Sequence, residues 1–242
     1  MSQSQYPLGV AIALHLLPGA LLTVFVLVAA NLGADAIVAL FVGIGLVIVP
    51  VELGYLLFRA KRTTGSWSLA GVLPYREKLS PSQYALWGAA LYVWFVAFLV
   101  ISMVVLDEWI ADQIFSWLPD TLLQFSAPEG ADDDYSRLAL AAFLVVVFLF
   151  NGLAGPVVEE LYFRGHLLPA IDRYGKWAPV LNAALFSLYH FWTPWQNPGR
   201  IIGLLPWVST VWRTRSLYLS IMVHVAVNLT FVLLLSAALL AE

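Results

Sequence analysis

Residues 8–30 read LGVAIALHLLPGALLTVFVLVAA, and this unbroken apolar run decides the fold class of the chain. A helix that crosses a bilayer needs roughly 20 consecutive apolar residues. The run has no Lys or Arg before it and is longer than the apolar part of a signal peptide. We therefore expect it to form a retained first membrane span.

Further apolar runs follow along the whole chain. Residues 36–58 and 83–106 are each long enough to span, and residues 138–154 form a slightly shorter run. Gly155-Pro156 then predicts the start of a new helix, because proline is favoured at a first helical position. Shorter and more polar helices are expected at residues 157–171, 177–190, 201–212 and 217–240. The sequence predicts an all-α, polytopic transmembrane bundle of about eight helices in a single domain, residues 1–242.

The composition excludes several classes of function. Hydrophobic residues make up 61% of the chain and charged residues 11%, against about 45–50% and about 25% in soluble domains. A net charge of −3 without a basic face excludes a nucleic-acid partner. The absence of cysteine excludes disulfides, thiolate zinc sites and cysteine catalysis. The high apolar and low charged content predicts a multi-pass protein in the lipid bilayer of the cell membrane.

Positive charges suggest an orientation, although their count decides little. Five Lys or Arg residues cluster between spans two and three, from Arg59 to Lys78, which predicts a cytoplasmic loop and a cytoplasmic N-terminus. Strict alternation of eight helices adds Arg200 to that side and places five other cations opposite. The balance is six against five, so the prediction depends on the clustered first hairpin.

Several polar side chains lie in the apolar second half, where a bilayer should exclude them. A charge at the centre of a span costs roughly 2.5–3.5 kcal/mol on insertion scales, so such groups normally face a bundle interior or a wet cavity. They are functional candidates by default. The set consists of Glu159, Glu160, Arg164, His190, His224 and Asn228.

The two adjacent glutamates are expected to have different roles. On an α-helix Glu160 and Arg164 stack one turn apart, whereas Glu159 is turned about 100° away from Glu160. Arg164 can neutralise Glu160, and this pair is interpreted as a structural clamp. Glu159 then has no local cation, and in an apolar site it can titrate near neutrality, as a general base requires.

Two histidines and an asparagine complete the candidate site. A short polar turn makes helices 157–171 and 177–190 antiparallel neighbours, which brings Glu159 and His190 to one depth where they can hold a water. Phe186 lies one turn before His190 on the same face. His224 and Asn228 share a face of the last helix and offer two donors for an oxyanion.

The other two histidines are interpreted as core residues. His15 lies beside Pro18 in the first span, and His166 follows Gly165. A lone histidine on an apolar face is more often a satisfied core residue than a catalyst. The four-residue group Glu159, His190, His224 and Asn228 differs because its members converge.

Three ordered motifs carry a resemblance to a known family. They are Glu159-Glu160-Leu161-Tyr162-Phe163-Arg164, Phe186-Ser187-Leu188-Tyr189-His190 and His224-Val225-Ala226-Val227-Asn228. Over residues 138–235 the chain resembles the intramembrane CAAX protease and bacteriocin-processing (CPBP, or Abi) family. That core is similar to the type II CAAX prenyl endopeptidases, eight-helix proteins that cut a prenylated C-terminal tripeptide from their substrates.

The resemblance implies a role for each matching residue. Glu159 and His190 would activate the attacking water, while His224 and Asn228 would stabilise the oxyanion. Glu160 and Arg164 would support the site, and His166 inherits no role. The implied partner is a membrane-embedded or lipid-modified peptide or protein.

Three alternatives remain open. Glu159, His190 and His224 offer three zinc ligands with a fourth position free. We expect no metal, because a ligating Glu159 could not also act as the base. A non-enzymatic immunity or scaffold protein would keep the bundle and tolerate loss of Glu159. A transporter would show broken helices in both halves, and none is identified in the first half.

Overall fold

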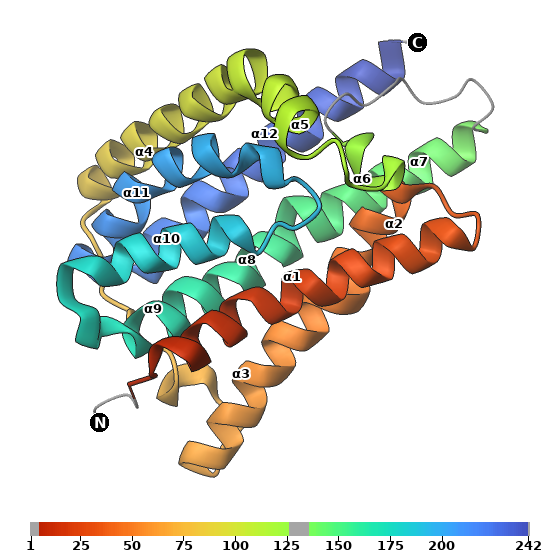
Figure 1. Cartoon of the computed structure of the whole chain (residues 1–242). Coiled ribbons are helices and arrows are strands. Elements are labelled where there is room, and N and C mark those ends of the chain that lie inside the picture. Colours follow the sequence, from red (N-terminus) through yellow and green to blue (C-terminus); the bar gives the residue numbers. More distant parts are fainter. Residues whose placement is uncertain (1–4, 126–135, 242) are drawn as a thin grey trace.

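The computed structural model describes residues 5–125 and 136–241, and within them the chain is an all-α membrane bundle (Figure 1). Five helical runs are long and apolar enough to cross a bilayer. They are Leu8–Asn31, Ala36–Thr64, Pro81–Ile114, Arg137–Ala170 and Leu217–Leu239. The predicted fold class of a polytopic helical bundle is confirmed.

The helices are distributed along the chain as follows. The first half contains α1 (Leu8–Asn31), α2 (Ala36–Gly43), α3 (Val49–Thr64), α4 (Pro81–Ser102), α5 (Glu108–Ile114) and α6 (Asp120–Leu123). The second half contains α7 (Arg137–Val146), α8 (Gly155–Glu159), α9 (Leu168–Ala170), α10 (Ala178–Leu188), α11 (Asn197–Thr214) and α12 (Leu217–Ala241). Four π-helical segments join helices without a break: η1 (Ile44–Ile48), η3 (Met103–Asp107), η4 (Val147–Ala154) and η5 (Glu160–Leu167).

The expected break at Gly155-Pro156 is wrong. Helices α7, α8 and α9 form one continuous run from Arg137 to Ala170 instead of two helices at 138–154 and 157–171. A proline inside an α-helix removes a hydrogen bond to the preceding turn and crowds its carbonyl. The π-helical turn η4 ends directly before α8 and absorbs this mismatch, as π-bulges do elsewhere.

This correction changes which loops share one end of the bundle. The N-terminal segment joins the end of α9, because the Tyr6 amide donates to the Ala170 carbonyl at 2.8 Å. The loop before α4 joins the turn between α11 and α12, because the Leu217 amide donates to the Tyr75 carbonyl at 3.0 Å. The turn between α9 and α10 lies at the same end, because Trp212 Nε1 near the end of α11 donates to Asp172 at 2.6 Å.

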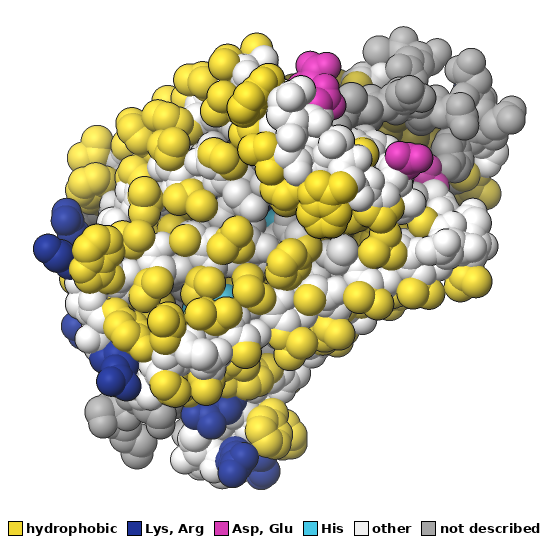
Figure 2. Space-filling view, viewed as in Figure 1, with side chains coloured by type: hydrophobic (Ala, Val, Ile, Leu, Met, Phe, Trp, Pro, Cys, Tyr) yellow, Lys and Arg dark blue, Asp and Glu magenta, His cyan; other side chains and the backbone are white. Residues whose placement is uncertain are grey.

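Positive charge gathers at this end (Figure 2). Its segments contain Arg59, Lys61, Arg62, Arg76, Lys78, Arg173, Lys176, Arg213 and Arg215. Arg137 begins the helical run at the opposite end, Arg200 lies near the start of α11, and Arg164 is buried in the middle. The charges therefore divide nine against two, whereas the expected alternation gave six against five.

The centre of the bundle is the junction of α8 and η5. Helices α1, α3, α10, α11 and α12 all contact this junction, and Figure 1 shows α8 lying between α1 and α10. Side chains cap the starts of two helices. A capping box at Ser80 begins α4, and the Asp35 side chain begins α2 by accepting from the amides of Ile37 and Val38. Flanking helices thus enclose one short segment of the fourth long span.

Gly19 permits a close approach of α1 to the centre of the bundle. A Cβ atom at Gly19 would overlap the backbone carbonyl of Tyr189, at the end of α10. Small residues at helix interfaces are the usual means of bringing backbones together in membranes. We expect Gly19→Ala to destabilise the fold by about 1–3 kcal/mol, as overpacking does.

Gly9→Ala provides the matched control on the same helix. A Cβ atom at Gly9 has no neighbour within 4 Å, so this change should be neutral or slightly stabilising. Thermal unfolding of both variants in detergent measures the difference. Equal melting temperatures for the two variants would contradict the close α1–α10 contact.

Candidate active site

Two consecutive glutamates at the α8–η5 junction are buried and have different partners. Glu159 is 8% exposed, and its Oε1 accepts a hydrogen bond of 2.8 Å from the Tyr189 hydroxyl. Its Oε2 lies 3.7 Å from His224 Nε2. That distance exceeds the usual hydrogen-bond range. One oxygen of Glu159 is therefore held in place, while the other faces a histidine across a short gap.

Glu160 orients His224. Its Oε1 accepts from His224 Nδ1 at 2.9 Å, and its Oε2 accepts from the Ser220 hydroxyl. Trp207 Nε1 in turn donates to Ser220 at 2.8 Å. A carboxylate that accepts from one ring nitrogen fixes the tautomer and the orientation of the imidazole. Helices α11 and α12 thus set Glu160, and Glu160 directs His224 Nε2 toward Glu159.

The ion pair expected between Glu160 and Arg164 is present, with 3.5 Å between Nη1 and Oε1. Both side chains are fully buried. The Arg164 guanidinium also lies 3.9 Å from the centre of the Phe186 ring, a distance typical of cation–π contact. Phe186 therefore supports the site through Arg164 as well as through its edge contact with His190, at 5.0 Å between ring centroids.

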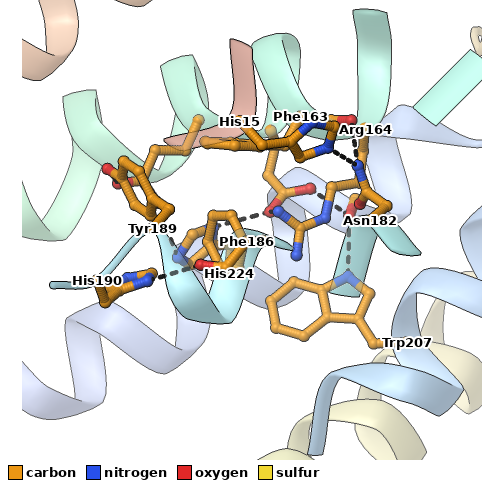
Figure 3. Close-up of polar contacts among 12 residues, drawn as sticks. His15, Phe163, Arg164, Asn182, Phe186, Tyr189, His190, Trp207 and His224 are labelled. Atoms are coloured by element: carbon orange, nitrogen blue, oxygen red, sulfur yellow. Dashed lines mark hydrogen bonds and ion pairs between the residues drawn. The ribbon is translucent and has the colours of Figure 1, made fainter. Parts of the chain in front are cut away.

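His190 lies at the end of α10 with one free ring nitrogen. Its Nδ1 donates to the Phe186 carbonyl at 2.8 Å, which leaves Nε2 as an acceptor. The ring packs against Tyr189 at 4.6 Å and Trp192 at 4.9 Å between centroids. Tyr189 thus contacts both Glu159 and His190, and Figure 3 shows Tyr189 and His190 on the same side of the group that it draws. In the described residues no direct hydrogen bond joins Glu159 to His190.

Arg200 anchors the loop that follows His190. Its Nη1 donates to the Ser187 carbonyl at 3.3 Å, and its Nη2 donates to Thr193 at 2.9 Å and Gln196 at 2.6 Å. One buried guanidinium thus bonds to the last turn of α10 and to two residues that follow it, which restricts the conformations of the loop between α10 and α11. The start of α11 therefore holds the His190 loop against the end of α10.

Asn228 lies one turn after His224 on α12, as expected, but its amide is already engaged. Its Nδ2 donates to the Asn151 carbonyl in η4 at 2.8 Å. A primary amide carries two N–H groups, so a second donor remains for a ligand. The structure therefore brings Glu159, Glu160, Arg164 and His224 into direct contact, with His190 and Asn228 at the margins of this group.

The other two histidines have partners in the core. His15 Nδ1 donates to the Ala11 carbonyl at 2.7 Å, and its Nε2 accepts from Asn182 at 3.0 Å. His166 contacts the Tyr6 hydroxyl at 3.1 Å and the Val72 carbonyl at 3.2 Å. Both side chains are buried, which agrees with their interpretation as core residues.

Several residues of the site were not identified from the sequence. Tyr189 and Ser220 lie within or beside the motifs, but they had no assigned partner until the fold placed them on Glu159 and Glu160. Glu52 is fully buried in the second span. Its signal was available, because an ionisable residue inside an apolar span is a functional candidate by default.

The zinc alternative concerns Glu159, His190 and His224. No group of three His, Asp or Glu side chains in the described part of the chain is arranged to hold a metal ion. His224 engages Glu160 through Nδ1, and Glu159 engages Tyr189 through Oε1. Each proposed ligand is thus engaged through one atom, and among the described residues Glu159 Oε2, His190 Nε2 and His224 Nε2 carry no hydrogen bond.

A comparison with protein families finds a match in the second half of the chain. Residues 141–230 match the family described as type II CAAX prenyl endopeptidase Rce1-like. No curated protein and no solved structure matches the chain. The matched residues include all three motifs. They confirm the resemblance drawn from those motifs: this part of the membrane bundle is similar to the CAAX protease family.

Proposed function

We propose that the chain is an intramembrane endopeptidase that hydrolyses a peptide bond of a membrane-associated protein or peptide. A prenylated CAAX-type sequence is the substrate class that the family match favours. The observation that carries the proposal is the Glu159 carboxylate, held by Tyr189 at one oxygen and facing His224 with the other. A multi-pass bundle presents this group to substrates that are themselves in the membrane.

Glu159 and His190 provide two acceptors for one water. Glu159 Oε2 and His190 Nε2 are the acceptor atoms that the internal hydrogen bonds leave available. A water that donates one hydrogen to each directs its oxygen lone pair at the substrate carbonyl carbon. As its oxygen bonds to that carbon, one proton passes to Glu159, which acts as general base.

His224 and Asn228 stabilise the negative charge that forms on the carbonyl oxygen. Glu160 keeps the proton on His224 Nδ1. His224 must therefore be protonated on both nitrogens to donate through Nε2. When the C–N bond breaks, the proton held by Glu159 transfers to the leaving nitrogen, and the products are a carboxylic acid and an amine.

The first test of this function is the loss of the base. Glu159→Gln keeps the shape of the side chain and its bond to Tyr189, but it cannot take a proton. We expect cleavage of a prenylated CAAX-type peptide to fall by at least about 10³-fold, while the melting temperature stays near wild type. Purified protein in detergent or lipid is assayed by mass spectrometry of the products.

Glu108→Gln provides the matched control, because Glu108 is an exposed acid on α5, outside the site. It should retain full activity. Normal cleavage by Glu159→Gln would show that another group is the base. A wild-type protein that binds the peptide but never cuts it would support the non-enzymatic alternative.

We propose further that hydrolysis needs no metal. The acceptor atoms of Glu159 and His190 are both used to hold the water, and Glu160 is committed to His224, Ser220 and Arg164. Recruiting Glu160 to a metal would leave a buried guanidinium unpaired, which typically costs about 3–5 kcal/mol. Using Glu159 as a ligand instead would leave the site without a carboxylate base.

A chelator tests the metal-free proposal. Protein dialysed against a strong chelator, with its zinc content checked by elemental analysis, should cleave at the rate of the untreated protein. Stoichiometric zinc whose removal abolishes cleavage, and whose return restores it, would contradict the proposal. Glu159, His190 and His224 would then be reassigned as ligands.

We propose that the N-terminus and the loop between α3 and α4 lie in the cytoplasm. The nine cations at that end of the bundle, against two toward the other, support this orientation under the positive-inside rule. The same rule left the sequence alone undecided, because an extra helix break inverted the later loops. In this orientation the basic loops lie on the cytoplasmic side of the membrane.

The cysteine-free chain allows a direct test of orientation by labelling. Leu32 is 83% exposed in the turn between α1 and α2, and Ser66 is exposed after α3. We expect Leu32→Cys to react with a membrane-impermeant maleimide in right-side-out vesicles and Ser66→Cys to react in inside-out vesicles. The reverse pattern would refute the proposed orientation.

A further inference from the structure

Glu52 is a buried carboxylate that the proposed mechanism does not use. It lies in the first turn of α3, inside the second membrane span and outside the residues that match the family. Its side chain is 0% exposed, and neither carboxylate oxygen has a hydrogen-bond partner among the described residues. An isolated polar group of this kind is costly to bury, so its retention requires a compensating group.

The surroundings of Glu52 contain a second group in the same situation. Arg164 is also 0% exposed, and within residues 5–125 and 136–241 its Nε, Nη1 and Nη2 have no hydrogen-bond partner. Helix α3 packs against α8 and η5, and Glu52 lies within electrostatic range of Arg164 and Glu159. Two carboxylate oxygens and three guanidinium nitrogens, all without a hydrogen-bond partner among the described residues, therefore occupy one buried region beside the proposed base.

The two groups do not form a salt bridge with each other. Among the described residues, the carboxylate oxygen within 4.0 Å of Arg164 belongs to Glu160, at 3.5 Å. A group that satisfies both Glu52 and Arg164 has to donate to the carboxylate and accept from the guanidinium. Water does both, whereas a simple cation or anion serves only one of them.

We propose that Glu52 and Arg164 bind internal water beside Glu159 and thereby retain a supply of water for hydrolysis. The role of this water rests on the proposed endopeptidase function, but its binding does not. The hydrocarbon region of a bilayer contains no water to replace the molecule that each hydrolysis consumes. A buried carboxyl group and a buried guanidinium next to the base keep water within reach of Glu159.

Kinetics of two Glu52 variants test the role of this water. Glu52→Leu replaces a buried polar group that has no hydrogen-bond partner among the described residues with an apolar one, so the melting temperature should stay level or rise. We expect its kcat to fall by about tenfold or more, with KM unchanged, because water supply and not substrate binding is impaired. Glu52→Gln, which still binds water, should restore part of the lost kcat.

Leu56→Met is the matched control, because Leu56 is fully buried one turn further along the same helix. It should leave kcat, KM and stability near wild type. A purely structural role for Glu52 would predict the opposite pattern for Glu52→Leu: a lower melting temperature and a normal kcat for the folded protein. That pattern would overturn the proposal.

A crystal structure that resolves water tests the binding site without any assay. We expect ordered water within hydrogen-bond distance of both the Glu52 carboxylate and the Arg164 guanidinium in the wild type, and its loss in Glu52→Leu. A direct Glu52–Arg164 salt bridge without water would overturn the proposal even if the variants were slow. Ordered water together with normal cleavage by Glu159→Gln would instead uphold the water site and refute the assigned base.

Discussion

The structure depends on the compensation of the Glu160 carboxylate, which is fully buried in an apolar bundle. Three side chains from two elements satisfy it: His224 and Ser220 on α12, and Arg164 one turn further along its own helix. Removing one partner of such a group leaves an unpaired buried charge. The same contacts that neutralise Glu160 fix the orientation of His224, so the stability of the core and the geometry of the site have one cause.

Helix continuity is the second constraint on the site. The π-helical turns η4 and η5 flank α8, so the run from Arg137 to Ala170 passes Pro156 without a break and still presents Glu159 and Glu160 to different neighbours. π-Helical turns are frequently found at functional sites. Because the run is one span and not two, each later loop lies at the end of the bundle opposite to the one that a break would give it. Most of the positive charge therefore gathers at one end.

Much of the candidate site follows from sequence periodicity, but its hydrogen bonds do not. The spacing of Glu160 and Arg164 predicted an ion pair that is present. The antiparallel turn also predicted that Glu159 and His190 lie at one level, where Tyr189 joins them. Helical spacing describes only contacts within a helix or between neighbours in sequence. It therefore contained no information on His224 with Glu160, which are 64 residues apart.

The sequence by itself determined the membrane bundle, the family resemblance and the polar residues that merit attention, because long apolar runs and charged interruptions are local properties of a chain. Tertiary structure alone decided that Gly155-Pro156 continues a helix and that α3, which carries Glu52, packs against η5, which carries Arg164. Both outcomes depend on neighbours brought together by packing. The cost of burying a charge is set by the groups that surround it, and those groups come from helices distant in the sequence.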